Sequence, residues 1–172
     1  MQEQMVEPGF PAGEYRDVLI GPGGRVQWET PWQRNLIVNN LRKLLAALVK
    51  GDPQGHAASY WAVGAGQAAW DAGPVPSEQD RRQLVQLYAE TGRKAIGPGQ
   101  IKFLGGAFTN QLEITAEFTS ADIAGDMSLR EFGLFAGGGG AANSGVLMNH
   151  RIHPRIDMQP GFTLQRTLRL TF

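Results

Sequence analysis

Three histidines and a scatter of carboxylates are the residues of this chain that could do acid–base or metal chemistry. His150 and His153 form the closest pair, but side chains three residues apart on a strand point to opposite faces. His56 is the only other histidine and cysteine is absent, so a zinc site would need carboxylates as further ligands. We therefore interpret the pair as ordinary turn or surface histidines and predict no metal site.

The carboxylates show no spacing that forces two of them together, as the acid pair of a glycosidase requires. No G-x-S-x-G motif marks a serine nucleophile, and no cysteine nucleophile exists. Gly64-Ala-Gly66 lacks the third glycine of a dinucleotide site. We therefore predict that the protein is not an enzyme, with no catalytic residues and no cofactor.

The composition argues against two classes of partner, nucleic acids and membranes. The chain has 172 residues, enough for one domain, and its 16 basic residues balance its 16 acidic ones. This balance argues against a general nucleic-acid binder, which would show a basic stripe. No apolar run reaches the ~20 residues of a membrane span, and the first residues do not resemble a signal peptide. We predict no nucleic-acid partner and no membrane insertion.

Short strands separated by glycine-rich turns must position whatever surface the protein uses. Tyr15–Ile20 and Arg25–Trp28 flank four turn residues and predict a β-hairpin. Apolar and polar residues alternate along Asn110–Thr119 and along Phe162–Phe172, where Arg166 is the single polar residue on the apolar face. The predicted fold is mainly β, an antiparallel β-sandwich or jelly-roll-like domain with one packed amphipathic α-helix.

Apolar residues recur with helical spacing over residues 36–50 and predict that helix, with Asn35 as N-cap and Gly51 at its C-terminal end. Its apolar face should be buried against the sheet; the face includes Leu41, Leu44, Leu45 and Leu48. A short helix over residues 78–90 follows a capping motif at Ser77. Residues 1–14 are polar and contain prolines, so we expect an extended arm held by a neighbouring chain, ahead of a single domain over residues 15–172.

Partner contacts are expected on loops and near turns. The candidate interface residues are Trp28, Trp32, Trp70, Asp71, Gly137, Gly138, Gly139 and Gly140. Trp70 is the favoured anchor, because partly exposed aromatic side chains commonly dominate protein interfaces. The tryptophans near turns could instead form a sugar-binding platform, which we rank below protein contact.

An ordered set of five motifs supports a resemblance. These are Trp32-Gln-Arg-Asn35 entering a helix, Gly64-Ala-Gly66, Leu87-Tyr-Ala-Glu90-Thr-Gly-Arg93, Leu129-Arg-Glu-Phe-Gly-Leu-Phe135, and Gly145-Val-Leu147 before a final strand. The succession resembles small tail-associated structural proteins of bacteriophages and phage-derived contractile particles, including the particle-attaching portions of tail fibres. Because no fibre shaft follows, the resemblance implies an adaptor, collar, baseplate or fibre-hub subunit.

The resemblance implies a non-enzymatic structural subunit that oligomerises and connects tail, baseplate or fibre components. Its partners would be copies of itself and neighbouring tail proteins. It would be located in a virion or phage-tail-like particle assembled in the bacterial cytoplasm. Two alternatives stay open: a lectin-like carbohydrate-binding β-sandwich that contacts a surface glycan, and a capsid decoration or neck protein.

Overall fold

The computed structural model describes residues 11–172, and its strands form one antiparallel sheet of eleven strands. The strand order is β5-β4-β8-β10-β3-β1-β11-β7-β6, with β2 added on β1 and β9 on β8. The strands are β1 (Ala12–Ile20), β2 (Val26–Glu29), β3 (Gln33–Ile37), β4 (Ala58–Gly64), β5 (Glu90–Ala95), β6 (Ile101–Phe103), β7 (Gln111–Thr119), β8 (Ser128–Ala136), β9 (Val146–Leu147), β10 (Asn149–Asp157) and β11 (Thr163–Thr171).

Two α-helices and four 3-10 turns lie in the connections. They are α1 (Asn40–Lys50), α2 (Glu78–Arg82), η1 (Pro22–Gly24), η2 (Ala68–Asp71), η3 (Pro98–Gln100) and η4 (Ser120–Asp122). Neither α-helix in the described part of the chain has the length and apolar character that crossing a membrane requires. The mainly β prediction with one packed helix is therefore confirmed.

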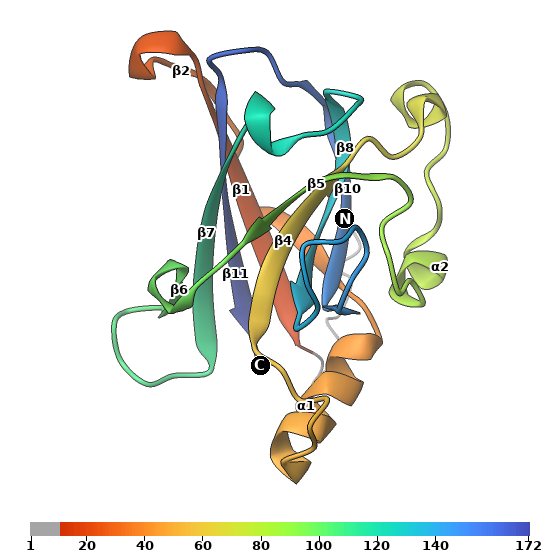
Figure 1. Ribbon diagram of the computed structural model, residues 1–172, viewed down its shortest axis with the longest axis vertical. Coiled ribbons are helices and arrows are strands. Elements are labelled where there is room, and N and C mark those ends of the chain that lie inside the picture. The colour runs from red at the N-terminus through yellow and green to blue at the C-terminus, as the bar shows by residue number, and fades with distance from the viewer. Residues whose placement is uncertain (1–10) are drawn as a thin grey trace, which may run out of the picture.

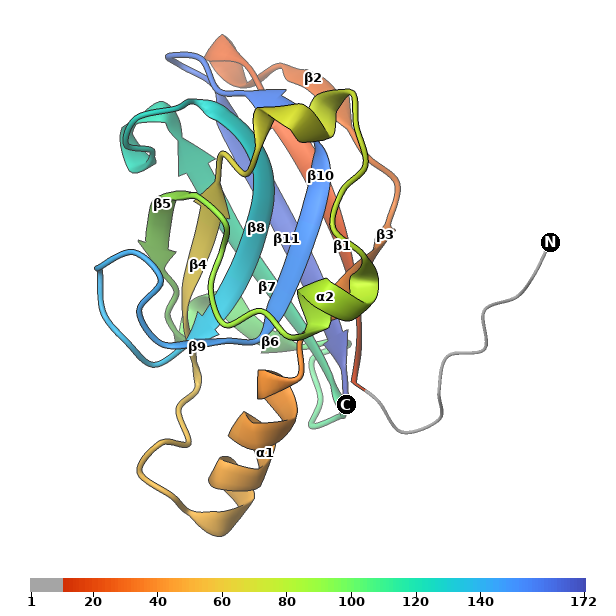
Figure 2. The same ribbon diagram turned by 90° about the vertical axis from the view of Figure 1, so that its right-hand side faces the viewer.

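The sheet curls on itself, so that β4, β8 and β10 face β1, β11 and β7 across one core (Figures 1 and 2). The chain leaving β5 crosses to the far side of the sheet and pairs there as β6 with β7. Near this crossing Gly92 forms a bridge with Ile123, and the Lys94 ammonium donates to the Glu117 carbonyl at 2.8 Å. Strand β5 therefore meets β7 and the segment after it through single contacts in place of a continuous ladder.

The alternation predicted for the last strand is confirmed. β11 lies between β1 and β7 with an uninterrupted register over its whole length. Every second side chain, including Leu164, Leu168 and Leu170, is buried. Burial of an apolar side chain of this size contributes about 1.5–3 kcal/mol. The predicted hairpin is also present as β1 and β2.

Strand β8 is buried on both faces, because a second layer covers the side away from the core. Leu87, Phe135 and Leu147 pack in this second layer with Val38 and Ala62. Helix α2 ends at Arg82, so the predicted helix over residues 78–90 is wrong beyond that point. The Ser77 cap is present, with its hydroxyl oxygen accepting a hydrogen bond from the Asp80 amide at 3.1 Å.

Helix α1 begins at Asn40, and the predicted start at residue 36 is wrong. Residues 36 and 37 pair with β10 as part of β3, and the Asn35 side chain accepts a hydrogen bond from Asn149 at 3.0 Å. Strand pairing with residues far along the chain therefore outweighs the local helical spacing. Asn39, not Asn35, is the N-cap residue.

The apolar face of α1 is only partly buried. Leu41 and Leu44 lie in the core and Leu45 is half-buried, whereas Leu48 is exposed and Val49 is 90% exposed. The predicted burial of Leu48 is wrong, because the last turns of α1 extend beyond the sheet (Figure 2).

The predicted boundary between arm and domain also shifts. β1 begins at Ala12, so residues 12–14 of the predicted arm belong to the sheet and pair with β11 and β3. Residues 1–10 of that arm lie outside the described residues. Lys94 belongs to β5, and residues 101–103 pair with β7 as β6.

Candidate functional site

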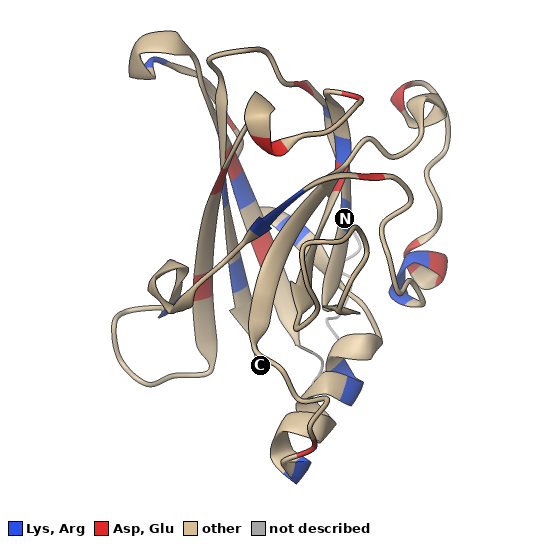
Figure 3. Ribbon diagram, in the orientation of Figure 1, with Lys and Arg blue, Asp and Glu red and all other residues tan. Residues whose placement is uncertain are grey.

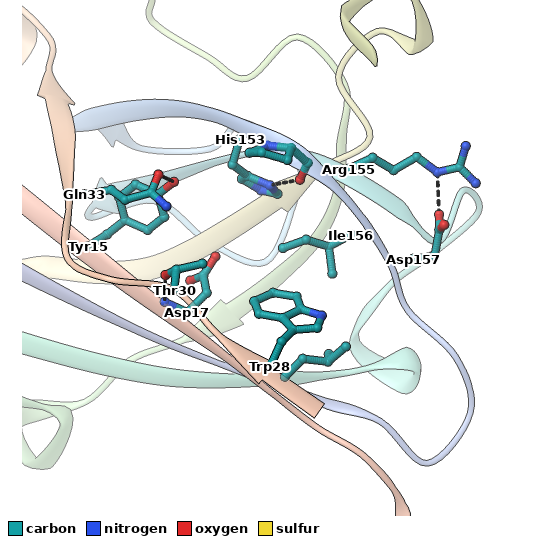
Figure 4. Close-up of a pocket in the computed structure, with 11 residues that line it drawn as sticks. Tyr15, Asp17, Trp28, Thr30, Gln33, His153, Arg155, Ile156 and Asp157 are labelled. Carbon is teal, nitrogen blue, oxygen red and sulfur yellow. Dashed lines mark hydrogen bonds and ion pairs between the residues drawn. The ribbon is translucent and has the colours of Figure 1, made fainter. Parts of the chain in front are cut away.

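A cavity of about 410 Å³ lies between β1, the β2–β3 segment and β10 (Figure 4). Cavities of ~300–1,000 Å³ are typical of small-molecule sites. Its lining combines apolar side chains with a few polar groups, and it includes Trp28 from the β1–β2 hairpin. The cavity is therefore one candidate ligand site among the described residues, and it combines an exposed indole with buried polar groups.

A buried ion pair lies at the inner side of this cavity. The Arg166 guanidinium donates to both carboxylate oxygens of Asp17, with Nε–Oδ1 at 2.7 Å and Nη2–Oδ2 at 2.6 Å. Both side chains are almost fully buried, and the guanidinium lies 4.0 Å from the centre of the Phe132 ring. The charge of Arg166, the single polar residue on the buried face of β11, is therefore neutralised by Asp17, which lies 149 positions away in the chain.

His153 lines the same cavity and is 6% exposed. Its Nδ1 lies 2.8 Å from the Pro154 carbonyl oxygen, which can only accept, so Nδ1 carries the proton. Burial, together with the positive charge of Arg166, lowers the pKa of His153 to about 3. Nε2 is then an acceptor, and it has no hydrogen-bond partner among the described residues.

The lining also includes Tyr15, Thr30, Gln33 and Trp28. The Tyr15 hydroxyl donates to the Gln33 side-chain oxygen at 2.9 Å, and the Thr30 hydroxyl oxygen accepts from the Asp17 amide at 3.0 Å. Trp28 is 36% exposed, and Figure 4 shows its indole beside Ile156. The cavity thus presents polar donors and acceptors next to one accessible aromatic side chain.

We expect His153 to make folding stability depend on pH between about 3 and 6.5. Its pKa is lower in the folded chain than in the unfolded one, so the unfolded chain binds more protons and stability falls as the pH falls through 6.5. Between pH 8 and pH 5 the free energy of unfolding should fall by about 2 kcal/mol from this group. Urea unfolding of the wild type and of His153→Gln at both pH values measures the difference, and an identical pH dependence in the two proteins would contradict it.

The predicted interface tryptophans have different environments. Trp28 is partly exposed at the cavity, and Trp32 is half-buried with the Arg169 guanidinium 3.9 Å from its ring centre. Trp70 is 9% exposed and packs edge-on against Tyr88 with ring centres 5.2 Å apart. The expectation that Trp70 presents an exposed indole is wrong, because η2 folds the ring over Gly66, where a Cβ atom would lie 2.2 Å from it.

Asp71 and the glycine loop are accessible only in part. Asp71 is exposed, but both its oxygens accept hydrogen bonds from Arg130 at 2.8 Å, which lower its pKa. Gly138 and Gly140 are exposed, while Gly137 and Gly139 are half-buried. A contact role for Asp71 and these glycines stays a prediction.

The glycine loop is attached to β5 by a buried ion pair. Arg93 donates to Glu90 at 2.7 Å and also to the carbonyl oxygens of Gly139 and Ser144, at 2.9 and 2.8 Å. Both charged side chains are at least 96% buried. Glu90 and Arg93 lie on β5, where the glycine loop covers them.

His150 and His153 are both buried on β10 and have different environments, so the interpretation as turn or surface histidines is wrong. The His150 Nε2 lies 2.8 Å from the Glu131 carboxylate, which also accepts from the Tyr88 and Ala89 amides. His153 lines the cavity. Within residues 11–172 no three potential metal ligands come together.

Comparisons with protein-family models, with curated proteins and with solved structures find no match to this chain.

Sequence reasoning did not identify the exposed apolar side chains at one end of the sheet. We call this set the apolar end; it comprises Leu48, Val49, Phe103, Phe108 and Phe172. Helix α1, the β6–β7 loop and the end of β11 lie at the same end of the molecule (Figures 1 and 2). An alternating or helical pattern predicts which apolar residues can be buried, but it does not predict which of them stay exposed. The pattern alone therefore could not distinguish the apolar end from the core.

Proposed function

We propose that this protein is a non-enzymatic structural subunit of a phage virion or phage-tail-like particle, where it oligomerises and connects tail, baseplate or fibre components. The observation that carries the proposal is the apolar end. The resemblance of the five sequence motifs to small phage tail proteins supplies the kind of particle.

Exposed apolar side chains grouped on projecting elements commonly mark protein contact sites. Phe108 is 95% exposed, and its ring packs edge-on against Phe103 with centres 5.4 Å apart. Val49 is nearly as exposed at the tip of α1. Aromatic anchors of this kind supply much of the binding energy at protein interfaces.

The net charge is compatible with a second copy of the chain as the partner at the apolar end. The formal net charge is zero, so copies experience no long-range repulsion from one another. Basic and acidic residues are distributed along the chain (Figure 3), but α1 contains Arg42, Lys43 and Lys50 and no acidic residue. A basic helix at the same end of the molecule as exposed phenylalanines suits an acidic and apolar patch on the neighbouring copy or tail protein.

The buried carboxylates of the described chain support a structural role. Asp17 binds Arg166, Glu90 binds Arg93 and an amide of the glycine loop, and Glu131 binds two amides and His150. Each of these carboxylates holds separate segments of the chain together.

We expect a Leu48→Glu/Phe108→Glu variant to assemble less well than the wild type while keeping its fold. Light scattering gives the mass of the wild-type assembly, and the variant should shift toward the monomer. Val85→Glu is the matched control, because Val85 is 59% exposed on the connection between α2 and β5. An unchanged assembly mass in the double variant, or a monomeric wild type that never binds particles, would contradict the proposal.

Immunogold labelling of particles from producing cells tests the place of the subunit. Label on tails, baseplates or fibres supports the proposal. Label on heads or necks would favour the alternative of a capsid decoration or neck protein.

The carbohydrate-binding alternative is supported by a different observation, the cavity beside Trp28. Retention of the wild type on a polysaccharide resin, with no particle label, would favour that function over the structural one.

A further inference from the structure

We propose that the cavity beside Trp28 binds one neutral, hydroxylated ring, such as a single pyranose unit of a glycan. This inference rests on the carbohydrate-binding alternative and not on the assembly role. The cavity is separate from the apolar end, so one molecule could carry both functions.

The charges around the cavity favour a neutral ligand. The Asp17 carboxylate is neutralised by Arg166, and His153 is uncharged. At the rim, Arg155 donates to Asp157 at 2.7 Å. Each carboxylate in the lining is therefore paired with a guanidinium, so a charged ligand gains no unpaired opposite charge, although Arg166 Nη1 keeps no hydrogen-bond partner.

His153 lines the cavity, and a ligand that reaches its buried, unpartnered Nε2 must donate a hydrogen bond to satisfy that atom. A buried acceptor without a partner is unfavourable, and an apolar ligand would leave it unpaired. The Thr30 hydroxyl and the Gln33 side-chain amide lie in the same lining, and both can donate to a ligand oxygen. A sugar hydroxyl both donates and accepts, so this set matches a polyol.

The aromatic side chain favours a ring over an open polyol. Trp28 leaves part of its indole accessible at the mouth, beside the apolar side chain of Ile156. The C–H groups on one face of a pyranose form an apolar surface that can pack on an indole, while its hydroxyls point to polar neighbours. The cavity volume of about 410 Å³ accommodates one such ring.

The test is a titration of isotope-labelled protein with neutral monosaccharides (glucose, galactose, mannose and N-acetylglucosamine), followed by the His153 side-chain nitrogen resonances. Binding of at least one sugar should move the Nε2 resonance upfield as its lone pair accepts a hydrogen bond. Glucosamine and glucuronate, which carry opposite charges, should bind more weakly than their neutral counterparts.

Trp28→Ala should weaken binding by about tenfold, the loss that corresponds to ~1.4 kcal/mol of contact. Trp32→Ala is the matched control, because Trp32 packs against Arg169 and does not line the cavity. The affinity of this variant for the sugar should be unchanged. His153→Phe should abolish binding, with a thermal melt to verify the fold. If His153→Phe is unfolded, the affinity of Trp28→Ala and the shift of the wild-type His153 Nε2 resonance still test the proposal.

The proposal is overturned if no neutral sugar moves the Nε2 resonance, if Trp28→Ala binds as tightly as the wild type, or if only charged sugars bind. The Leu48→Glu/Phe108→Glu variant separates the two functions. It should lose assembly and keep sugar binding, so failure of one function leaves the other measurable.

Discussion

Replacing Arg166 with methionine is expected to lower the free energy of unfolding by about 3–5 kcal/mol. The substitution leaves the Asp17 carboxylate buried without its partner, in a part of the core where Phe132 and His153 offer no compensating charge. An uncompensated buried charge costs far more than the lost hydrogen bonds alone. Urea denaturation at pH 7 measures the effect.

The double variant Asp17→Leu/Arg166→Met is the control. Replacing both members of a buried ion pair with apolar side chains of similar size is often neutral or stabilising, so most of the lost stability should return. A loss below about 1 kcal/mol in the single variant would contradict the prediction, since it would show that water reaches Asp17.

Replacing Arg93 with methionine is expected to cost a comparable ~3–5 kcal/mol and to release the glycine loop. The variant leaves Glu90 buried without its cation and leaves the Gly139 and Ser144 carbonyl oxygens without their donor. Urea denaturation measures the stability. Amide hydrogen exchange should accelerate at Gly139 and Asn143, whose amides donate within this network.

The neighbouring Lys94→Met is the matched control for Arg93. Lys94 is paired with Asp122, but both side chains are partly exposed, and such pairs contribute ~0–1 kcal/mol. Its effect should therefore be small, and exchange in the glycine loop should be unchanged. Equal effects of the two substitutions would show that the burial of Arg93 does not determine its contribution.

Elements with a strong local pattern were predicted correctly. The alternation along residues 162–172 placed β11 and identified Arg166 as the exception, and the glycine turn identified the β1–β2 hairpin. The helix cap at Ser77 was likewise predicted from Ser77 and Asp80, which lie three positions apart. In each case the interactions that decide the structure lie within a few residues of one another, or repeat with a period of two.

The start of α1 and the environments of the tryptophans required the tertiary structure. Residues 36 and 37 fit a helical period, but pairing with β10, more than a hundred residues later, holds them in a strand. Trp70 lies between turn residues typical of an exposed loop, yet Tyr88 and Gly66 enclose its ring.

The sequence by itself determined the antiparallel β class, the packed helix and the single polar residue on the last apolar face, because period and turn chemistry are local properties. The partner of that residue was determined only by the fold, since Asp17 and Arg166 are 149 positions apart and meet through the pairing of β1 with β11. The cavity and the apolar end likewise depend on how the sheet curls, which brings β1 and β10 together and leaves the last turns of α1 beyond its edge.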